Sequence, residues 1–291
     1  MKRIFSILAT IAICLTCHAE TITIIPEYHV GDTLKYRIKT NVRVDHGLDS
    51  LVYSLEFFPR MVIESRNDMG FVISTSTTVG DFNAECSDPE ANCSPDFLSM
   101  REIVVSEFTD SVGFLEIQLD SVCRPMSILN IDEVKERYVQ GFLKMAAKQA
   151  DITLEELMAQ EERINELRHY LTSVIDSIYS PRHILDEQFG YTAYFSFIGE
   201  PLNFSKIIAS KVLAPKIMFL TPGIHSLDIH VSGNSGNCTV ETQGATDKSS
   251  VSGRWTFHSG IPVTGILHIK TAEWSDGADT FTITYTIDKI Q

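Results

Sequence analysis

The chain has 291 residues, with 24 Lys and Arg against 38 Asp and Glu, and a formal net charge of −14. Such an acidic chain is a poor candidate for binding nucleic acid or anionic lipid head groups by charge. Hydrophobic residues make up 44% of the chain, which is enough for a normal core and excludes a largely disordered protein.

The first nineteen residues have the pattern of a secretory signal peptide. Lys2 and Arg3 precede an apolar run, and small residues stand at the −3 and −1 positions of a cut between Ala19 and Glu20. No other stretch contains enough consecutive apolar residues for a transmembrane helix. We therefore expect an exported protein, and the pattern leaves periplasm and cell surface equally open.

The expected signal peptide also contains motifs that are typical of two covalent modifications, haem attachment and a lipid anchor. Cys14, Cys17 and His18 form the C-x-x-C-H pattern of covalent haem attachment. Because they lie in the segment that we expect to be removed, we favour a protein without haem or another cofactor. Cys14 or Cys17 could instead carry a lipid anchor, but the residues before each cysteine fit that signal poorly, so we favour simple cleavage.

Four cysteines remain after residue 19, and an even number in an oxidising compartment indicates disulfides. Cys86 and Cys93 enclose a short polar loop that a bridge could close. We therefore predict a Cys86–Cys93 disulfide and, by elimination, a Cys123–Cys238 disulfide. Buried free thiols are the alternative for both pairs.

The first third of the chain reads as antiparallel β-structure. Residues 34–44 alternate apolar or Thr side chains with Lys, Arg and Asn, which predicts a strand with one buried and one solvated face. Similar alternation continues over residues 53–57 and 71–78. Residues 103–108 and 114–119 flank Asp110–Gly113, which predicts a hairpin. The basic stripe of the first strand could bind an anion, although acidic neighbours on the sheet are the favoured explanation.

The middle of the chain changes to helical periodicity. Asn130 can cap a helix with Glu133 three residues later, and Thr153 can open a second helix with Glu156 as its capping-box partner. The second helix is expected to run to about Tyr179. An apolar stripe on these helices predicts packing on the sheet or, less favoured, cover for a ligand or a partner helix.

The last third returns to alternating strands, beginning with residues 191–197 and ending with residues 280–288. Strands, then two helices, then strands predict the α+β class, with an antiparallel sheet and a helical insertion. We expect one domain over residues 20–291, divided into a β part (20–128), the insertion (129–180) and a second β part (181–291).

The sequence contains no motif for a nucleophile elbow, a zinc protease, a phosphate-binding loop or a dinucleotide site. Asp228 and His230 could share one face of a strand and supply half of a metal site, but ordinary surface histidines are favoured. Cys238 near a histidine could act as a thiol nucleophile, and a disulfide or inert thiol is favoured instead. We therefore predict neither catalytic nor metal-binding residues.

One further pattern is the triplet of Asp, then Ser or Thr, then an aliphatic residue. It resembles the O-glycosylation acceptor signal of some Gram-negative secretory systems. Because Asp-Ser also stabilises turns and helix caps, we favour turn chemistry for these triplets. They begin at Asp32, Asp49, Asp110, Asp120 and Asp176.

The order of these features carries a resemblance of pattern. A signal peptide is followed by amphipathic strands beginning Gly31-Asp32-Thr33-Leu34, a hairpin, a helical middle and a β C-terminal half. The chain resembles uncharacterised exported families of Gram-negative bacteria. More distantly it is similar to the half-barrel of periplasmic lipoprotein carriers. That resemblance implies a curved antiparallel sheet, half-barrel or sandwich-like, whose apolar face is covered by helices, and it supplies no site residues.

Three functions remain open at this stage. The leading hypothesis is a non-enzymatic, exported binding protein of the envelope that holds an apolar or lipid-like ligand between sheet and helices. The alternative is a structural or envelope-assembly protein that acts through a protein partner. The third is a hydrolase whose residues converge only in three dimensions.

Overall fold

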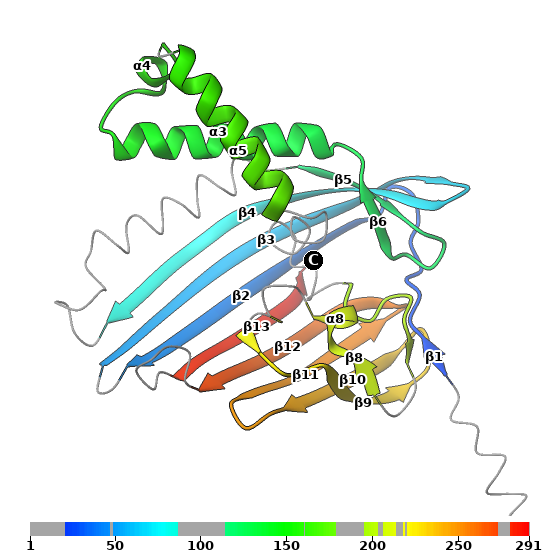
Figure 1. Cartoon of the computed structure of the whole chain (residues 1–291). Helices are drawn as coiled ribbons and strands as arrows, with labels where there is room; N and C mark the ends of the chain where they lie inside the picture. Colours follow the sequence, from blue (N-terminus) through cyan, green and yellow to red (C-terminus); the bar gives the residue numbers. More distant parts are fainter. Residues whose placement is uncertain are drawn as a thin grey trace, which may run out of the picture.

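The structure is a computed structural model, and a long curved sheet dominates it (Figure 1). The residues that the structure describes are 21–46, 49–86, 114–159, 161–178, 195–202, 206–213, 218, 220–272 and 280–290. The expected signal peptide, with its cleavage site at Ala19 and Glu20, and the proposed partner Cys93 lie outside these residues. Those predictions remain predictions.

The described strands form one eleven-stranded antiparallel sheet, in the order β6-β5-β4-β3-β2-β13-β12-β11-β10-β9-β8, and a separate two-stranded sheet of β1 and β7. This arrangement, together with helices in the middle of the chain, confirms the predicted α+β class. The strands are β1 (Ile22–Thr23), β2 (Thr33–His46), β3 (Asp49–Asn67), β4 (Gly70–Cys86), β5 (Leu115–Leu119), β6 (Pro125–Ile128), β7 (Pro201–Leu202), β8 (Lys206–Ile208), β9 (Ser226–Gly233), β10 (Cys238–Ala245), β11 (Ser249–His258), β12 (Ile261–Ala272) and β13 (Thr280–Ile290).

Alternation along β2 gives the sheet an apolar face and a polar face. Leu34, Tyr36 and Ile38 are buried, whereas Lys35 and Arg37 between them are exposed. Successive side chains of a strand point to opposite sides, so this pattern buries one face only. The strand predicted for residues 34–44 is confirmed.

Strand β13, near the C-terminal end of the chain, pairs with β2, near the N-terminal end. Val42 lies opposite Ile283, and Arg37 lies opposite Asp288, where the two side chains form an ion pair at 3.6 Å. The strands before and after the helices therefore belong to one sheet. Pairing between segments so distant in sequence could not be derived from local alternation alone.

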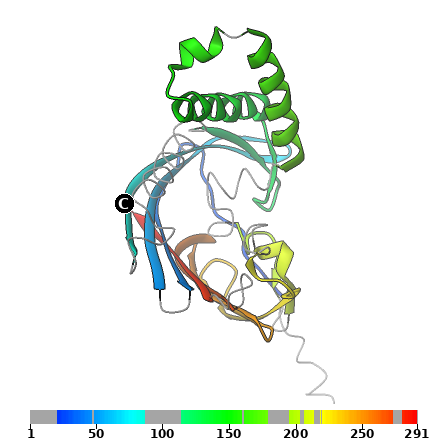
Figure 2. The ribbon, with the colours of Figure 1, turned by 60° about the vertical axis from the view of Figure 1, so that its left-hand side comes forward.

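The sheet is curved, as Figure 2 shows, and two of its glycines lie beneath a buried tryptophan. Trp255 on β11 is 2% exposed, and its side chain lies over Gly253 and Gly265. A Cβ added at Gly253 would come within 2.5 Å of Trp255 Cη2, and one at Gly265 within 2.7 Å of Cδ1. Phe197 meets the indole edge-on at 4.9 Å between ring centroids. Bare backbone at both positions leaves the large ring room to lie flat against the strands.

Helix α3 (Ile131–Gln149) begins at the predicted position, but its predicted capping box does not form. The Asn130 side chain bonds strand β5 instead: its Oδ1 accepts from the Glu116 N–H at 2.9 Å and its Nδ2 donates to the Phe114 carbonyl at 3.1 Å. Both polar atoms of the Asn130 side chain thus bond the sheet edge, and the side chain makes no cap hydrogen bond to the helix.

The single long helix predicted from Thr153 is two helices, α4 (Leu154–Met158) and α5 (Glu161–Ile178). The predicted capping box of Thr153 and Glu156 is present. The hydrophobic periodicity beyond it is continuous, which is why the interruption after residue 158 gave no signal in the sequence. Ile164 on α5 is buried, as predicted.

The helices lie over the β4–β6 end of the sheet (Figures 1 and 2). The apolar side chains of α3, including Val134, Tyr138 and Leu143, are buried in the same hydrophobic cluster as Ile73 and Ile117 of β4 and β5. At the other end, the short helix α8 (Ala209–Val212) lies on the inner side of the curve (Figure 2). Helices thus lie at both ends of the sheet, α3 to α5 at the β4–β6 end and α8 at the other.

One local prediction falls outside the described residues and another is wrong. Strand β5 has β4 and β6 as its described neighbours, whereas the turn predicted at Asp110–Gly113 and the strand predicted at residues 103–108 lie outside the described residues. Phe195 and Phe197 are buried as expected for an alternating strand, but they lie in a turn. Aromatic burial alone does not distinguish the two conformations.

The contact between Trp255 and glycine can be tested by adding one methyl group. We expect Gly253→Ala to lower the free energy of unfolding by about 2 kcal/mol, because the new Cβ overlaps a buried indole. Gly236→Ala is the matched control, since its Cβ would meet only Asn234 Oδ1, at 3.7 Å. Urea denaturation followed by tryptophan fluorescence measures both. Equal stability of the two variants would contradict the prediction.

Candidate ligand-binding surface

The most extensive candidate site is the apolar face at the middle of the sheet, on β3, β2 and β13. Four rows of residues cross these strands, and we call their side chains the central apolar surface. Thr40 is the only polar residue among them apart from two tyrosines. The rows are Phe57-Ile38-Ile287, Leu55-Thr40-Tyr285, Tyr53-Val42-Ile283 and Leu51-Val44-Phe281.

Burial divides this surface into a closed part and a part that remains half-exposed. Ile38, Val42, Ile283 and Ile287 are buried. The other apolar members, on both sides of these residues, are only half-buried, and most of them pack against the main hydrophobic cluster. The surface is therefore continuous with the core but accessible in part.

Local sequence explains why the surface is apolar along its whole length. Each of the three strands places apolar residues or Thr at every second position, and the antiparallel register sets these positions opposite one another. Six residues separate Ile38 from Val44, so at about 3.4 Å per residue the surface is about 20 Å long.

Side chains from far along the chain cover the apolar face beside this surface. Besides its contact with Trp255, the segment around residues 195–221 bonds to the sheet through Thr271, whose hydroxyl donates to the Leu220 carbonyl. The Ser196 hydroxyl donates to the Val212 carbonyl at 2.6 Å, which ties α8 to the turn that carries Phe197. This cover lies over β8–β12.

Tyrosines near the covered ends are held neutral. Burial raises the pKa of Tyr28 well above its usual value, with smaller contributions from Tyr36 and Cys123. Burial likewise raises the pKa of Tyr36. Tyr28 packs edge-on against Phe71 at 5.8 Å between ring centroids. These phenols act as apolar walls, not as proton donors or acceptors near neutral pH.

The predicted Cys123–Cys238 disulfide is wrong, because both residues are buried free cysteines. Cys123 lies in the β5–β6 turn with a positive φ of 65°, and its thiol faces the Pro26 carbonyl at 3.9 Å. Cys238 opens β10. The prediction paired the two cysteines that remained after the Cys86–Cys93 assignment. It could not take into account that these thiols are buried at two separate sites, because only the fold shows this.

Burial also argues against a thiol nucleophile. It raises the pKa of the Cys123 thiol to about 11, with Asp120 adding to the effect and Arg66 opposing it. Burial raises the pKa of Cys238 to about 11 as well. Reactive cysteines need the opposite shift, toward the thiolate.

Three histidines of the last third, His230, His258 and His268, lie on the polar face, and His225 lies in the loop before β9. Asp228, which could have shared a metal with His230, forms an ion pair with Lys206 at 3.6 Å. His268 Nδ1 lies 3.0 Å from the Thr284 hydroxyl. Over the described part of the chain, no group of three or more His, Cys, Asp or Glu residues is placed to hold a metal ion.

Two of the Asp-Ser/Thr triplets show turn chemistry. Asp120 Oδ1 accepts from the backbone N–H groups of Val122 and Arg124, at 3.0 and 2.8 Å, and Asp32 Oδ2 accepts from the His29 N–H at 2.9 Å. These bonds are those of turn-stabilising aspartates, which is the explanation favoured from the sequence.

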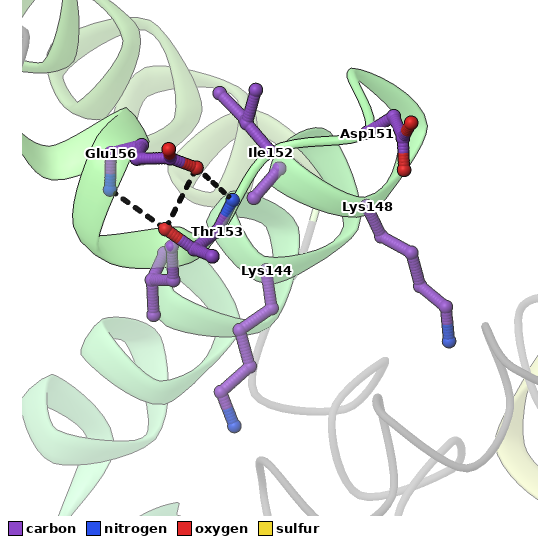
Figure 3. Close-up of a pocket in the computed structure, with 8 residues that line it drawn as sticks. Lys144, Lys148, Asp151, Ile152, Thr153 and Glu156 are labelled. Atoms are coloured by element: carbon purple, nitrogen blue, oxygen red, sulfur yellow. Dashed lines mark hydrogen bonds between the residues drawn. The ribbon is translucent and has the colours of Figure 1, made fainter.

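A hollow of about 540 Å³ lies at the junction of α3 and α4 (Figure 3). Asp151 adopts a positive φ of 53°, and the N–H of Ile152 donates to the Ala147 carbonyl at 3.1 Å, as in a Schellman motif. Hydrogen bonds from the Thr153 backbone and side chain lower the pKa of Glu156. These hydrogen bonds belong to the end of α3 and the start of α4, so they explain the polar groups of the hollow without a ligand. The sequence signal for this turn, Asp followed by Ile, is weak.

No helix within the described residues is both long enough and apolar enough to cross a membrane. No family model and no curated protein matches the sequence. One solved structure, concerned with lipid–protein interactions in lipovitellin, is similar over 91% of this chain, with a TM-score of 0.45 and 8% sequence identity. The match covers 26% of that protein, so the chain spans about a quarter of its length, and no ligand is transferred from it.

The two buried thiols give a direct chemical prediction. In a chain beginning at Glu20 with Cys86→Ser and Cys93→Ser, a thiol reagent at pH 8 should label Cys123 and Cys238 only after denaturation. With a pKa of about 11, about one thiol in a thousand is ionised at that pH, and burial blocks access as well.

The control for this experiment adds an accessible thiol to the same chain. Ser121 lies two residues before Cys123 and is exposed, so the thiol of a Ser121→Cys variant should react quickly in the native protein. Rapid native labelling of the parent chain would show that the thiols are not buried.

Proposed function

We propose that the protein is a non-enzymatic, exported binding protein of the cell envelope that holds an extended acyl chain on the central apolar surface. The observation that carries the proposal is the set of four apolar rows across β3, β2 and β13, whose outer members are only half-buried. Completing their burial releases water from apolar area, which favours binding.

The chemistry of the surface selects among apolar partners. Apart from Thr40 and the hydroxyls of Tyr53 and Tyr285, its side chains carry no hydrogen-bonding group. An extended peptide on this face would bring backbone N–H and C=O groups without partners, and each such group costs free energy. An acyl chain carries no such groups, and the surface length of about 20 Å suits one in extended form.

A fluorescent long-chain fatty acid tests this proposal. We expect the wild-type chain to bind it, and Leu55→Asp to weaken binding at least about tenfold, because a carboxylate on the apolar surface must be desolvated by the ligand. Val52→Asp is the matched control: Val52 lies on the same strand but on the opposite face, where it is 36% exposed. The readout is ligand fluorescence on titration.

A second variant separates loss of binding from loss of folding. Leu55→Trp keeps the surface apolar but fills it, so it should reduce binding while the circular dichroism spectrum stays native. Equal affinity of wild type, Leu55→Asp and Leu55→Trp would contradict the acyl-chain site. Capture of a helical partner without fatty-acid binding would favour the assembly function instead.

Export is tested by the mass of the chain recovered from its own envelope fraction. The proposal predicts a chain beginning at Glu20, with no mass added covalently by haem or acyl groups. A chain that retains residues 1–19 in that fraction would contradict cleavage. The mass lost on denaturation would report a bound ligand independently of this result.

A further inference from the structure

Two hollows that share Thr256 lie over β9–β13 and the neighbouring strand β2. The first has a volume of about 430 Å³ and the second about 630 Å³. Thr256 lies between the buried Trp255 and Phe257 in sequence, so its side chain is on the face opposite the core. The two hollows therefore meet on the outer face at Thr256, and the second is also lined by the buried side chains of Cys238 and Phe257.

Hydroxyl and amide groups from five neighbouring strands and one turn line these hollows. The strand register brings them together: Thr256 lies opposite both Thr239 and Thr264, and Ser232 lies opposite Thr239. Such groups both donate and accept hydrogen bonds. The hydroxyl and amide residues of the lining are Ser232, Asn237, Thr239, Thr256, Thr264 and Thr286, and the other uncharged lining residues are Cys238, Phe257, His258, Val263, Gly265 and Ile266.

Cations border the lining in a chain whose net charge is negative. Arg254 and Arg37 line the first hollow together with the carboxylate of Asp288, and Lys289 lines the second. Arg254 is paired with Glu241 and Arg37 with Asp288, each at 3.6 Å between nitrogen and oxygen. That separation is longer than a good hydrogen bond, so both guanidinium groups retain donors for a ligand.

Exposure keeps these arginines available at the rim. The side chain of Arg254 is 64% exposed and that of Arg37 is 49% exposed. A planar guanidinium can bind a carboxylate through two parallel hydrogen bonds. The hydroxyl groups, the apolar side chains of Phe257, Val263 and Ile266, and the two arginines together fit a sugar chain, which presents hydroxyl groups and apolar ring faces and can carry carboxylates at intervals.

We propose that these joined hollows bind an acidic polysaccharide, with carboxylates at Arg37 and Arg254 and sugar hydroxyls against the Thr, Ser and Asn side chains. A shared residue between two hollows suits a chain-like ligand that passes from one to the other. The site is on the opposite face from the acyl-chain surface and does not depend on it.

Polygalacturonate is the probe, with dextran as its neutral counterpart, and affinity is measured by calorimetry at low and moderate salt. The double variant Arg37→Gln/Arg254→Gln should bind polygalacturonate about tenfold more weakly, as expected for two exposed charge pairs. Thr256→Val, which removes the shared hydroxyl at nearly constant volume, should also weaken binding. Arg60→Gln is the matched control, since Arg60 is exposed on the outer face of β3 but outside both hollows.

The result that supports the proposal is loss in the double variant and in Thr256→Val, with Arg60→Gln unchanged. An equal loss in Arg60→Gln would show diffuse charge attraction and overturn the site. Equal affinity for dextran would overturn the requirement for carboxylates. Failure of the wild-type chain to bind polygalacturonate, or preference for a single-stranded nucleic acid, would overturn the ligand class.

Discussion

The pairing of β2 with β13 is the interaction on which the rest of the structure depends. It joins strands that precede the helices to strands that follow them, and its register places Val42 opposite Ile283 and Val44 opposite Phe281. A shift of one residue would turn every apolar side chain of one strand to the solvated face. The continuous apolar face, and with it the proposed acyl-chain surface, exists only in this register.

A sheet of this length must remain open without aggregating through its edges. Its two edge strands are short: β6 spans Pro125–Ile128, and β8 spans Lys206–Ile208. Proline lacks an N–H for pairing, and a lysine on an edge disfavours the approach of another strand. Helices α3 to α5 lie at one end of the sheet and α8 at the other (Figure 2), and the strands between them keep half-buried apolar side chains.

The two faces of the sheet have different chemistry because their side chains alternate. The inner face offers apolar area with few polar atoms, whereas the outer face offers hydroxyls and ion pairs such as Arg43 with Asp45 at 2.8 Å. An acyl chain and an acidic polysaccharide are suited to opposite faces of the same strands. The basic stripe of β2 illustrates the division, because Arg37 pairs with Asp288, as the favoured interpretation of the sequence required, and also borders an outer hollow.

The sequence by itself determined the local elements: the alternation of β2, β3 and β4, the capping box at Thr153 and the buried face of α3 all follow from residues close together in the chain. It did not determine which strands are neighbours, because the pairing energy of β2 with β13 depends on segments more than two hundred residues apart. Contacts with other parts of the fold also decide that the Asn130 side chain bonds to β5 instead of capping its helix, and that Cys123 and Cys238 remain separate thiols. The outer hollows gave no sequence signal, since Thr256 meets Thr239 and Thr264 only across three strands. Local hydrogen bonding and periodicity fix the elements, whereas contacts that close long loops decide which surfaces those elements create.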